Sequence, residues 1–274
     1  MLPRFFVVGG QKCGTTSLQQ YLSLHPNIYL PSQKETKFFV FDDRYRLGIA
    51  NYEAQFYSSV QKHEVPGEID PDYMYFPCAL ERMRKNLPLD ELKFIFILRN
   101  PVERAYSHYL MTRRRGLESL SFEDALLEEE NRIERNQLWD MHYSYFRRGL
   151  YLDQINRFLQ HVDRNRTYYI LSSELKANPV STLNEICTFL GVATNLIELS
   201  DSPEMLNKAT LPRSTKLLTR IESKEPGIEK RILRSLVPQK LRHRLRERLL
   251  RLNQTGSNIP NMGAEVYSFL HDKY

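Results

Sequence analysis

Cysteine is scarce in this chain, with three residues in 274, at positions 13, 78 and 187. Their odd number and wide spacing argue against a disulfide framework and match no zinc-ligand pattern. We therefore expect reduced thiols, no metal site and a cytoplasmic protein.

Long apolar runs are also missing. The run from Leu2 to Gly10 is too short to span a bilayer. It also lacks the charged leader and the cleavage site of a signal peptide. We expect this run to form the first β-strand, and we expect no membrane partner.

Internal repeats and low-complexity linkers are absent as well, so we expect a single domain over residues 1–274. Short apolar or aromatic runs alternate with longer helical patterns, which predicts a central, mostly parallel β-sheet flanked by helices. The expected strands are residues 4–8, 28–30, 67–69, 93–98 and 167–171. The expected helices are residues 15–24, 101–113, 151–159 and 179–190, with another opening after Ser121.

The net charge is +6, which fits an anionic cofactor, an anionic substrate, nucleic acid or simply a solvated basic surface. Much of the basic charge lies in a helical pattern over about residues 216–252, where leucines recur on one face. A helix packed on the domain by its leucines is the interpretation we favour over a nucleic-acid-binding arm. No aromatic side chains interleave with the charges to stack bases, so we expect no nucleic-acid partner.

A phosphate-binding loop follows the first expected strand. Its glycines allow a tight turn close to an anion, and the helix after it offers free N–H groups. Hydroxyls and a lysine add donors. The candidate ligands are Gln11, Lys12, Cys13, Gly14, Thr15, Thr16 and Ser17. The lysine precedes the second glycine instead of following it, unlike the loop of ATP and GTP enzymes. Together with the missing acidic residue after the later strand 93–98, this disfavours a kinase.

A second motif follows strand 93–98. Arg99 leaves the strand, Asn100 suits a helix N-cap, and Pro101 suits the first helical position. Ser107 lies about two turns further along the same helix. The arginine stands at the carboxyl end of a strand, where ligands of open α/β sheets collect.

These two motifs, in this order, resemble those of the sulfotransferases that use 3′-phosphoadenosine 5′-phosphosulfate (PAPS). The resemblance covers roughly residues 1–215, and Arg148-Gly149-Leu150-Tyr151 and Phe189-Leu190-Gly191 also carry it. It implies a P-loop-like three-layer α/β fold, PAPS as cofactor without a metal, and 3′-phosphoadenosine 5′-phosphate (PAP) as product. The acceptor would be a hydroxyl or amine of a small molecule or a carbohydrate.

The same resemblance implies roles for single residues. Lys12 would neutralise the leaving 5′-phosphate, while Arg99 and Ser107 would bind the 3′-phosphate. Glu35 stands three residues before Phe38-Phe39, where glycan-type relatives carry their proposed general base. Arg213 or Lys208 would close over PAP, although a solvated loop is an equal alternative. Cys13 is interpreted as a small filler and not as a nucleophile.

The acceptor side is less defined. Lys37 stands where relatives often carry histidine, and Glu68 and Asp70 lie in a segment that faces the acceptor in the family. Asp70 and Asp72, which favour a cationic or neutral acceptor, are equally well explained as turn formers around Pro71. His108 is an alternative base or, by our preferred interpretation, a partly exposed helix residue. Tyr143, with Tyr145 and Trp139, would line an acceptor pocket or belong to the core.

Three other functions stay open at this point. A non-catalytic protein that binds PAP is one, an ATP-dependent kinase is another, and nucleic-acid binding by the basic helix is the third. The presence of both Lys12 and Glu35 argues against the non-catalytic protein.

Overall fold

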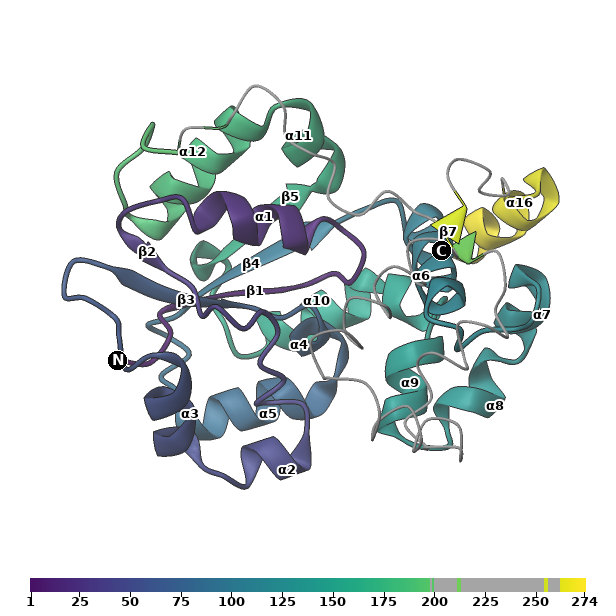
Figure 1. Ribbon diagram of the computed structural model, residues 1–274, viewed down its shortest axis with the longest axis horizontal. Coiled ribbons are helices and arrows are strands. Elements are labelled where there is room, and N and C mark those ends of the chain that lie inside the picture. The colour runs from purple at the N-terminus through teal and green to yellow at the C-terminus, as the bar shows by residue number, and fades with distance from the viewer. Residues whose placement is uncertain (198, 200–210, 213–253, 256–261) are drawn as a thin grey trace, which may run out of the picture. The chain divides into compact units, whose positions relative to one another are not determined.

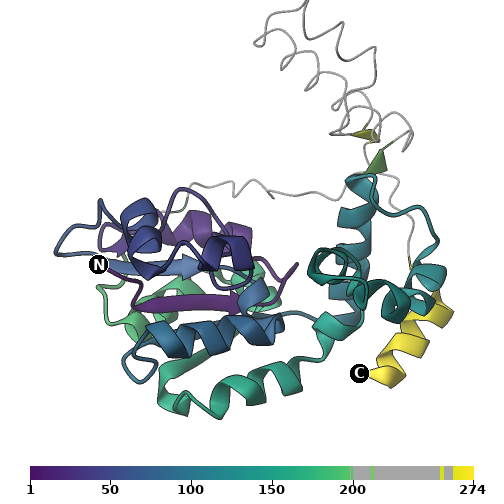
Figure 2. The ribbon, with the colours of Figure 1, turned by 90° about the horizontal axis from the view of Figure 1, so that it is seen from below.

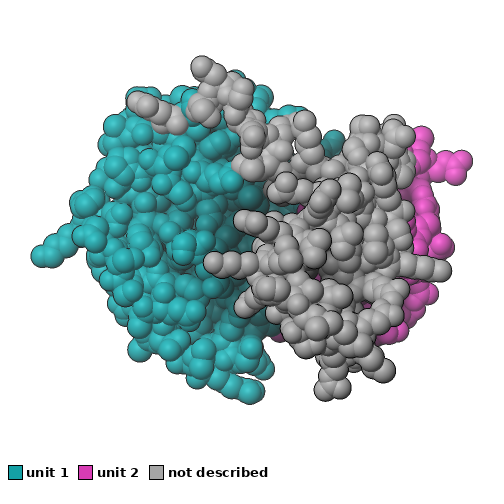
Figure 3. All heavy atoms as spheres, in the orientation of Figure 1, with its two compact units in different colours: residues 1–104, 147–206 teal, residues 105–146, 207–274 magenta. Residues whose placement is uncertain are grey.

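The structure, a computed structural model, describes residues 1–197, 199, 211–212, 254–255 and 262–274. The chain forms two compact units, which Figure 3 shows in different colours. Residues 1–104 and 147–206 make the first unit, and residues 105–146 and 207–274 make the second. A single domain over residues 1–274 stays a prediction. The basic segment at about 216–252 lies outside the described residues.

The first unit is built on a five-stranded sheet in the order β2-β3-β1-β4-β5 (Figure 1). The strands are β1 (Phe5–Gly9), β2 (Ile28–Tyr29), β3 (Val65–Ile69), β4 (Lys93–Leu98) and β5 (Thr167–Leu171). Every pairing between neighbours is parallel. The sheet predicted from the sequence is therefore confirmed, with strand bounds that differ by a few residues at most.

Helices cover both faces of this sheet because side chains alternate along its buried strands. Phe5, Val7, Ile95 and Ile97 point to one face and pack with apolar residues of three helices. These helices are α1 (Thr15–Leu22), α11 (Ser172–Ala177) and α12 (Pro179–Leu190). All three lie on the same side of the sheet in Figure 1. Each such side chain contributes about 1.5–3 kcal/mol when it is fully buried.

The other face carries aromatic side chains. Phe94 and Phe96 meet Phe158 edge to face, and Phe6 packs against Phe39 and Tyr73. The helices on this side include α3 (Ile49–Phe56), α5 (Pro77–Asn86) and α10 (Tyr151–Leu159). Helices α5 and α10 lie side by side (Figure 2), and residues of both line one surface hollow. Short turns of helix complete the unit: α2 (Asp42–Tyr45), α4 (Asp72–Tyr75), η1 (Arg147–Gly149) and η2 (Arg164–Arg166).

Two predicted helix ends are confirmed in detail. Asn100 caps α6 (Pro101–Arg114), because its side-chain oxygen accepts from the N–H groups of Val102 at 3.0 Å and Glu103 at 3.2 Å. Gly191 ends α12 with a φ of 79°, a conformation that suits glycine.

The second unit is helical. Its described residues contain α6 from Ala105 onward and four further helices. These are α7 (Phe122–Leu127), α8 (Glu129–Ile133), α9 (Gln137–Tyr143) and α16 (Ala264–Lys273). Buried Glu118 organises its interior, since the carboxylate accepts from Arg132 at 2.5 Å and from Tyr145 at 2.9 Å. A short antiparallel pair, β6 (Leu211–Pro212) with β7 (Gln254–Thr255), also belongs to it.

No helix within the described parts of the chain has both the length and the apolar character needed to cross a membrane.

Candidate active site

The loop between β1 and α1 is shaped to hold an anion. Gly14 occupies the N-cap position of α1 with a φ of 104°, and Lys12 also has a positive φ of 69°. A Cβ atom on Gly10 would lie 3.1 Å from the Cys13 sulfur, so the turn leaves little room for a side chain. The first turn of α1 carries no acidic residue, and its free N–H groups and positive dipole end face the loop. The residues present therefore fit a bound phosphate.

This loop lies at the point where the order of the strands in the sheet reverses. The chain leaves β1 toward β2 and β3, whereas it leaves β4 toward β5 on the other side. Strands β1 and β4 are neighbours, so the loop after β1 and Arg99 after β4 share the carboxyl edge of the sheet. Ligands of open α/β sheets bind at such a switch point.

Tyr151 joins the two segments. Its hydroxyl donates to the carbonyl oxygen of Arg99 at 3.0 Å and lies 3.6 Å from the sulfur of Cys13. Sequence reasoning noted Tyr151 only as part of a family segment and assigned it no role. The sequence signal was the Arg-Gly-Leu-Tyr run itself, which places the ring at the start of α10.

Cys13 behaves as a buried filler, in agreement with its interpretation from the sequence. It is 1% exposed, and burial raises the pKa of its thiol, although Tyr151, Arg104 and Arg99 lower it in part. A thiol held in its protonated form is a poor nucleophile.

Arg99 is placed where a ligand can reach it. Its side chain is 33% exposed, and its guanidinium pairs with the carboxylate of Glu103, one helical turn on, at 3.0 Å. Ser107 lies half-buried on α6 in the second unit, so its joint action with Arg99 on one phosphate stays a prediction. Arg213 and Lys208 lie outside the described residues.

Glu35 lies between two lysines. Its carboxylate accepts from Lys34 at 2.9 Å and pairs with Lys37 at 3.1 Å. Burial raises the pKa of Glu35, but the charges of Lys37 and Lys34 outweigh burial, so the net pKa is lowered. Lys34 also donates to the hydroxyl of Thr16 at 2.9 Å. Sequence reasoning missed this bridge, although Lys34 stands directly before the predicted base.

Lys37 is the centre of a buried ionic cluster. Its ammonium group donates to Asp70 at 2.8 Å and also pairs with Asp72, which in turn accepts from Arg148 at 2.5 Å. Asp70 and Asp72 are 0% and 1% exposed. The acidic patch that the sequence indicated is therefore neutralised within the protein by Lys37 and Arg148.

The pKa values in this cluster follow from burial and charge. Burial raises the pKa of Asp70 to about 7, although the charge of Lys37 opposes it. Burial would also raise the pKa of Asp72, but Lys37 and Arg148 hold it well below its usual range. Between the two carboxyls, Asp72 has two cations, so Asp70 takes up a proton first.

Glu68 is fully buried and accepts hydrogen bonds from Thr36. Its carboxylate accepts from the hydroxyl of Thr36 at 2.5 Å and from Tyr73 at 2.9 Å, and burial raises its pKa. Glu68 and Asp70 hold neighbouring protein groups in this structure, and their contact with an acceptor stays a prediction.

The predicted partly exposed position of His108 was wrong. His108 is 0% exposed, because the face of α6 that carries it is the buried one, and its ring meets that of Tyr145 edge to face at 5.0 Å. Tyr143 is also buried and donates to the carbonyl of Leu117 at 2.8 Å. Both lie in the second unit, and their role toward an acceptor stays a prediction.

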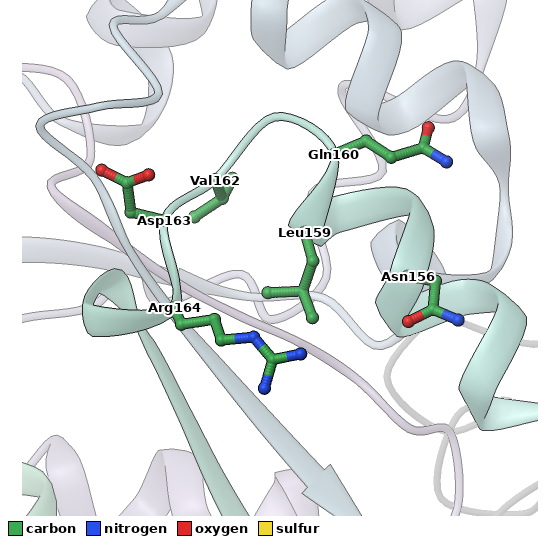
Figure 4. Close-up of a pocket in the computed structure, with 6 residues that line it drawn as sticks. All are labelled: Asn156, Leu159, Gln160, Val162, Asp163 and Arg164. Carbon is green, nitrogen blue, oxygen red and sulfur yellow. The ribbon is translucent and has the colours of Figure 1, made fainter.

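A surface hollow of about 540 Å³ lies elsewhere on the first unit, where α10 ends and the chain enters β5. Figure 4 shows its lining residues, among them Asn156, Asp163 and Arg164, spread around an open depression. Because it precedes β5, it is at the amino end of that strand and does not belong to the phosphate-binding edge. Within residues 1–197 and the other described parts, no group of three or more metal-ligating side chains is present.

A parallel sheet with an anion-binding loop after β1 and an arginine after β4 defines a phosphate-binding α/β protein. The model of the sulfotransferase domain family matches residues 2–236, and the chain belongs to this family. A solved sulfotransferase from Alicyclobacillus acidocaldarius is 35% identical, with a TM-score of 0.64 over 74% of this chain and 88% of that one. The likeness confirms the P-loop-like three-layer fold predicted above.

Curated relatives give the same family. The chain is 36% identical over 141 residues to the membrane-associated sulfotransferase kil1 of Dictyostelium discoideum, covering 48% of this chain and 29% of that protein. It is 28% identical over 202 residues to the human bifunctional heparan sulfate N-deacetylase/N-sulfotransferase 2, covering 70% of this chain and 22% of that protein. The chain thus spans less than a third of the length of either relative.

Proposed function

We propose that this protein transfers a sulfuryl group from PAPS to a hydroxyl or amine of a small molecule or carbohydrate and releases PAP. The observation that carries the proposal is the junction of two anion-binding segments at one sheet edge. The loop of Lys12 and the end of β4 at Arg99 are tied together by Tyr151. The two segments match the two phosphates of one PAP molecule, and family membership supports the same conclusion.

In this proposal the chain positions charge and removes a proton. The acceptor atom forms a bond to sulfur while the bond from sulfur to the bridging oxygen of the 5′-phosphate breaks. Lys12 and the N-terminus of α1 balance the charge that collects on that oxygen. Glu35 accepts the proton that the acceptor loses. Lysine in the loop supplies the charge that a metal ion supplies in kinases.

The nucleotide is tested by titration calorimetry with PAP in the absence of magnesium. We expect a Kd in the micromolar range, weakened at least about tenfold in Arg99→Ala and in Lys12→Ala because each loses a charge-assisted contact. Arg84→Ala, which removes an exposed arginine from α5, is the matched control and should bind like the wild type. No binding at millimolar PAP, or tighter binding of ATP with magnesium, contradicts the proposal.

The base is tested by turnover. With a broad panel of alcohols and amines as acceptors, release of PAP from PAPS should fall about 10²- to 10⁴-fold in Glu35→Gln while PAP still binds. PAP binding without turnover on any acceptor would favour a non-catalytic nucleotide-binding protein instead.

We also propose that the protein works in the cytoplasm, with neither a membrane nor a nucleic acid as its partner. The free thiols of Cys13, Cys78 and Cys187 support a reducing compartment. Cell fractionation tests this, and recovery of the protein with membranes or in an oxidising compartment would contradict it.

A further inference from the structure

Lys34 links the phosphate-binding loop to the proposed base. Its ammonium nitrogen donates to three oxygens: the hydroxyls of Thr15 at 3.3 Å and Thr16 at 2.9 Å, and the carboxylate of Glu35 at 2.9 Å. Both threonines belong to the first turn of α1, where an anion is expected. One cation therefore lies between the anion site and Glu35.

The backbone around this cation is held in place by one residue of β3 and by the residue that follows the strand. Glu35 and Lys37 have positive φ angles of 60° and 56°, which cost roughly 1 kcal/mol or more each for residues with a side chain. The segment keeps this conformation because Glu68 accepts from the N–H of Thr36 at 3.3 Å and Asp70 accepts from the N–H of Lys37 at 2.9 Å. Any change of partner for Lys34 is therefore a movement of its side chain.

The two lysines beside Glu35 differ in their freedom to move. Lys37 is bound to both Asp70 and Asp72, and its side chain is 11% exposed. Lys34 has Glu35 as its ion-pair partner, two neutral hydroxyls as its other acceptors, and a side chain that is 23% exposed. A phosphate at the N-terminus of α1 would attract Lys34 more strongly than those hydroxyls do, because it carries full negative charge.

We infer that Lys34 is a positioning residue that couples occupation of the phosphate loop to the basicity of Glu35. When the loop is empty, Lys34 pairs with Glu35. When the anionic donor is bound, Lys34 turns to the donor, and Lys37 is then the one lysine that still pairs with Glu35. The inference rests on the sulfotransferase activity proposed above and adds an ordering to it. Glu35 becomes a stronger base only when there is a sulfuryl group to transfer.

The charges that act on Glu35 set the direction of the effect. Lys37 and Lys34 lower its pKa, while burial and the charge of Asp72 raise it, and Asp70 lies beyond Lys37. Removal of one of the two cations must raise the pKa of Glu35. The carboxylate of Glu35 is therefore more basic when the donor is bound than it is in the free protein.

Steady-state kinetics as a function of pH measure this difference directly. Here kcat/KM for PAPS reports the enzyme without donor, and kcat reports the enzyme with donor bound. In the wild type, the acid limb of kcat/KM should lie at lower pH than the acid limb of kcat, by roughly half a pH unit for a pair as exposed as this one. In Lys34→Gln the limb of kcat/KM should move up to meet that of kcat. Lys34→Arg, which keeps a cation, should restore the separation.

A second readout does not depend on turnover. Calorimetry of PAP binding at acid pH, in buffers of different ionisation enthalpy, should show more proton uptake in the wild type than in Lys34→Gln. Protonation of PAP itself also depends on the charge of Lys34, so the same pair is compared in the Glu35→Gln background, and the difference between the two comparisons is the proton uptake by Glu35. Lys62→Gln removes an exposed lysine from another loop and should match the wild type in both experiments.

The outcomes separate the two proposals. If the wild type binds PAP and turns over but its two acid limbs coincide, the coupling is wrong and the sulfotransferase activity stands. If the limbs are separated equally in the wild type and in Lys34→Gln, Lys34 is not the coupling residue. If the wild type does not bind PAP, the proposed function fails and this inference fails with it.

Discussion

Lys37 and Asp70 are bound to each other twice. The ammonium group of Lys37 donates to one carboxylate oxygen of Asp70 at 2.8 Å, and its backbone N–H donates to the other at 2.9 Å. The side chain directly after β3 therefore fixes both the backbone and the charge of the residue two positions after the proposed base.

Lys37→Met should destabilise the protein strongly. The change leaves Asp70 and Asp72 buried without their shared cation, and loss of one partner from a buried ion pair costs about 3–5 kcal/mol. Urea denaturation at neutral pH measures the change in the free energy of unfolding. Lys62→Met, at an exposed position, is the control and should stay within about 0.5 kcal/mol of the wild type. A loss below about 1 kcal/mol for Lys37→Met would show that the cluster tolerates the missing charge.

Asp70 should make stability depend on pH. Its pKa is raised by burial to about 7 in the folded protein, above the value of about 3.9 in an unfolded chain. The folded state thus holds the proton more tightly, so the stabilisation is complete below about pH 4 and is lost as pH rises toward 7. The free energy of unfolding of the wild type, minus that of Asp70→Asn, should fall by up to a few kcal/mol over this range and level off above it. A difference that is constant from pH 4 to 8 contradicts the raised pKa.

Glu103→Gln should strengthen PAP binding. Glu103 pairs with Arg99 at 3.0 Å, and Arg99 must give up this partner to bind a phosphate fully. Exposed pairs one helical turn apart are worth about 0.3–0.5 kcal/mol, so affinity should rise about twofold. Glu81→Gln changes the net charge equally on an exposed part of α5 and should show a smaller effect. Unchanged or weaker PAP binding in Glu103→Gln would mean that Glu103 orients Arg99 and does not compete for it.

Tyr151→Phe should weaken PAP binding. It should also lower the free energy of unfolding by about 1 kcal/mol, the net value of a typical hydrogen bond. The lost hydroxyl joins Arg99 to Cys13, so the two phosphate-binding segments lose their link. Calorimetry with PAP and thermal unfolding measure the two effects. Tyr169→Phe, at a ring that is 43% exposed, is the control. A loss of stability with full PAP affinity would show that the link is structural alone.

Local signals made much of the fold predictable. A few neighbouring residues were enough to predict the apolar run of β4, the Asn100-Pro101 start of α6 and the apolar face of α10. The phosphate loop was predictable for the same reason, since glycines, lysine and hydroxyls follow one another between a strand and a helix.

Long-range pairings were not predictable in this way. Nothing near Lys37 in the sequence indicates that its partners come from the end of β3, or that Arg148 completes the cluster. The bridge from Lys34 to α1 joins residues that are 18 and 19 positions apart in the sequence. His108 was placed wrongly because helical periodicity alone does not say which side of α6 is covered.

The ionic cluster also limits how this protein can change. Lys37, Asp70 and Asp72 share their charges so closely that substitution of one leaves the others unbalanced, and effects at neighbouring ionic positions are not additive. The cost of replacing all three side chains together is therefore not the sum of the costs of the three single replacements.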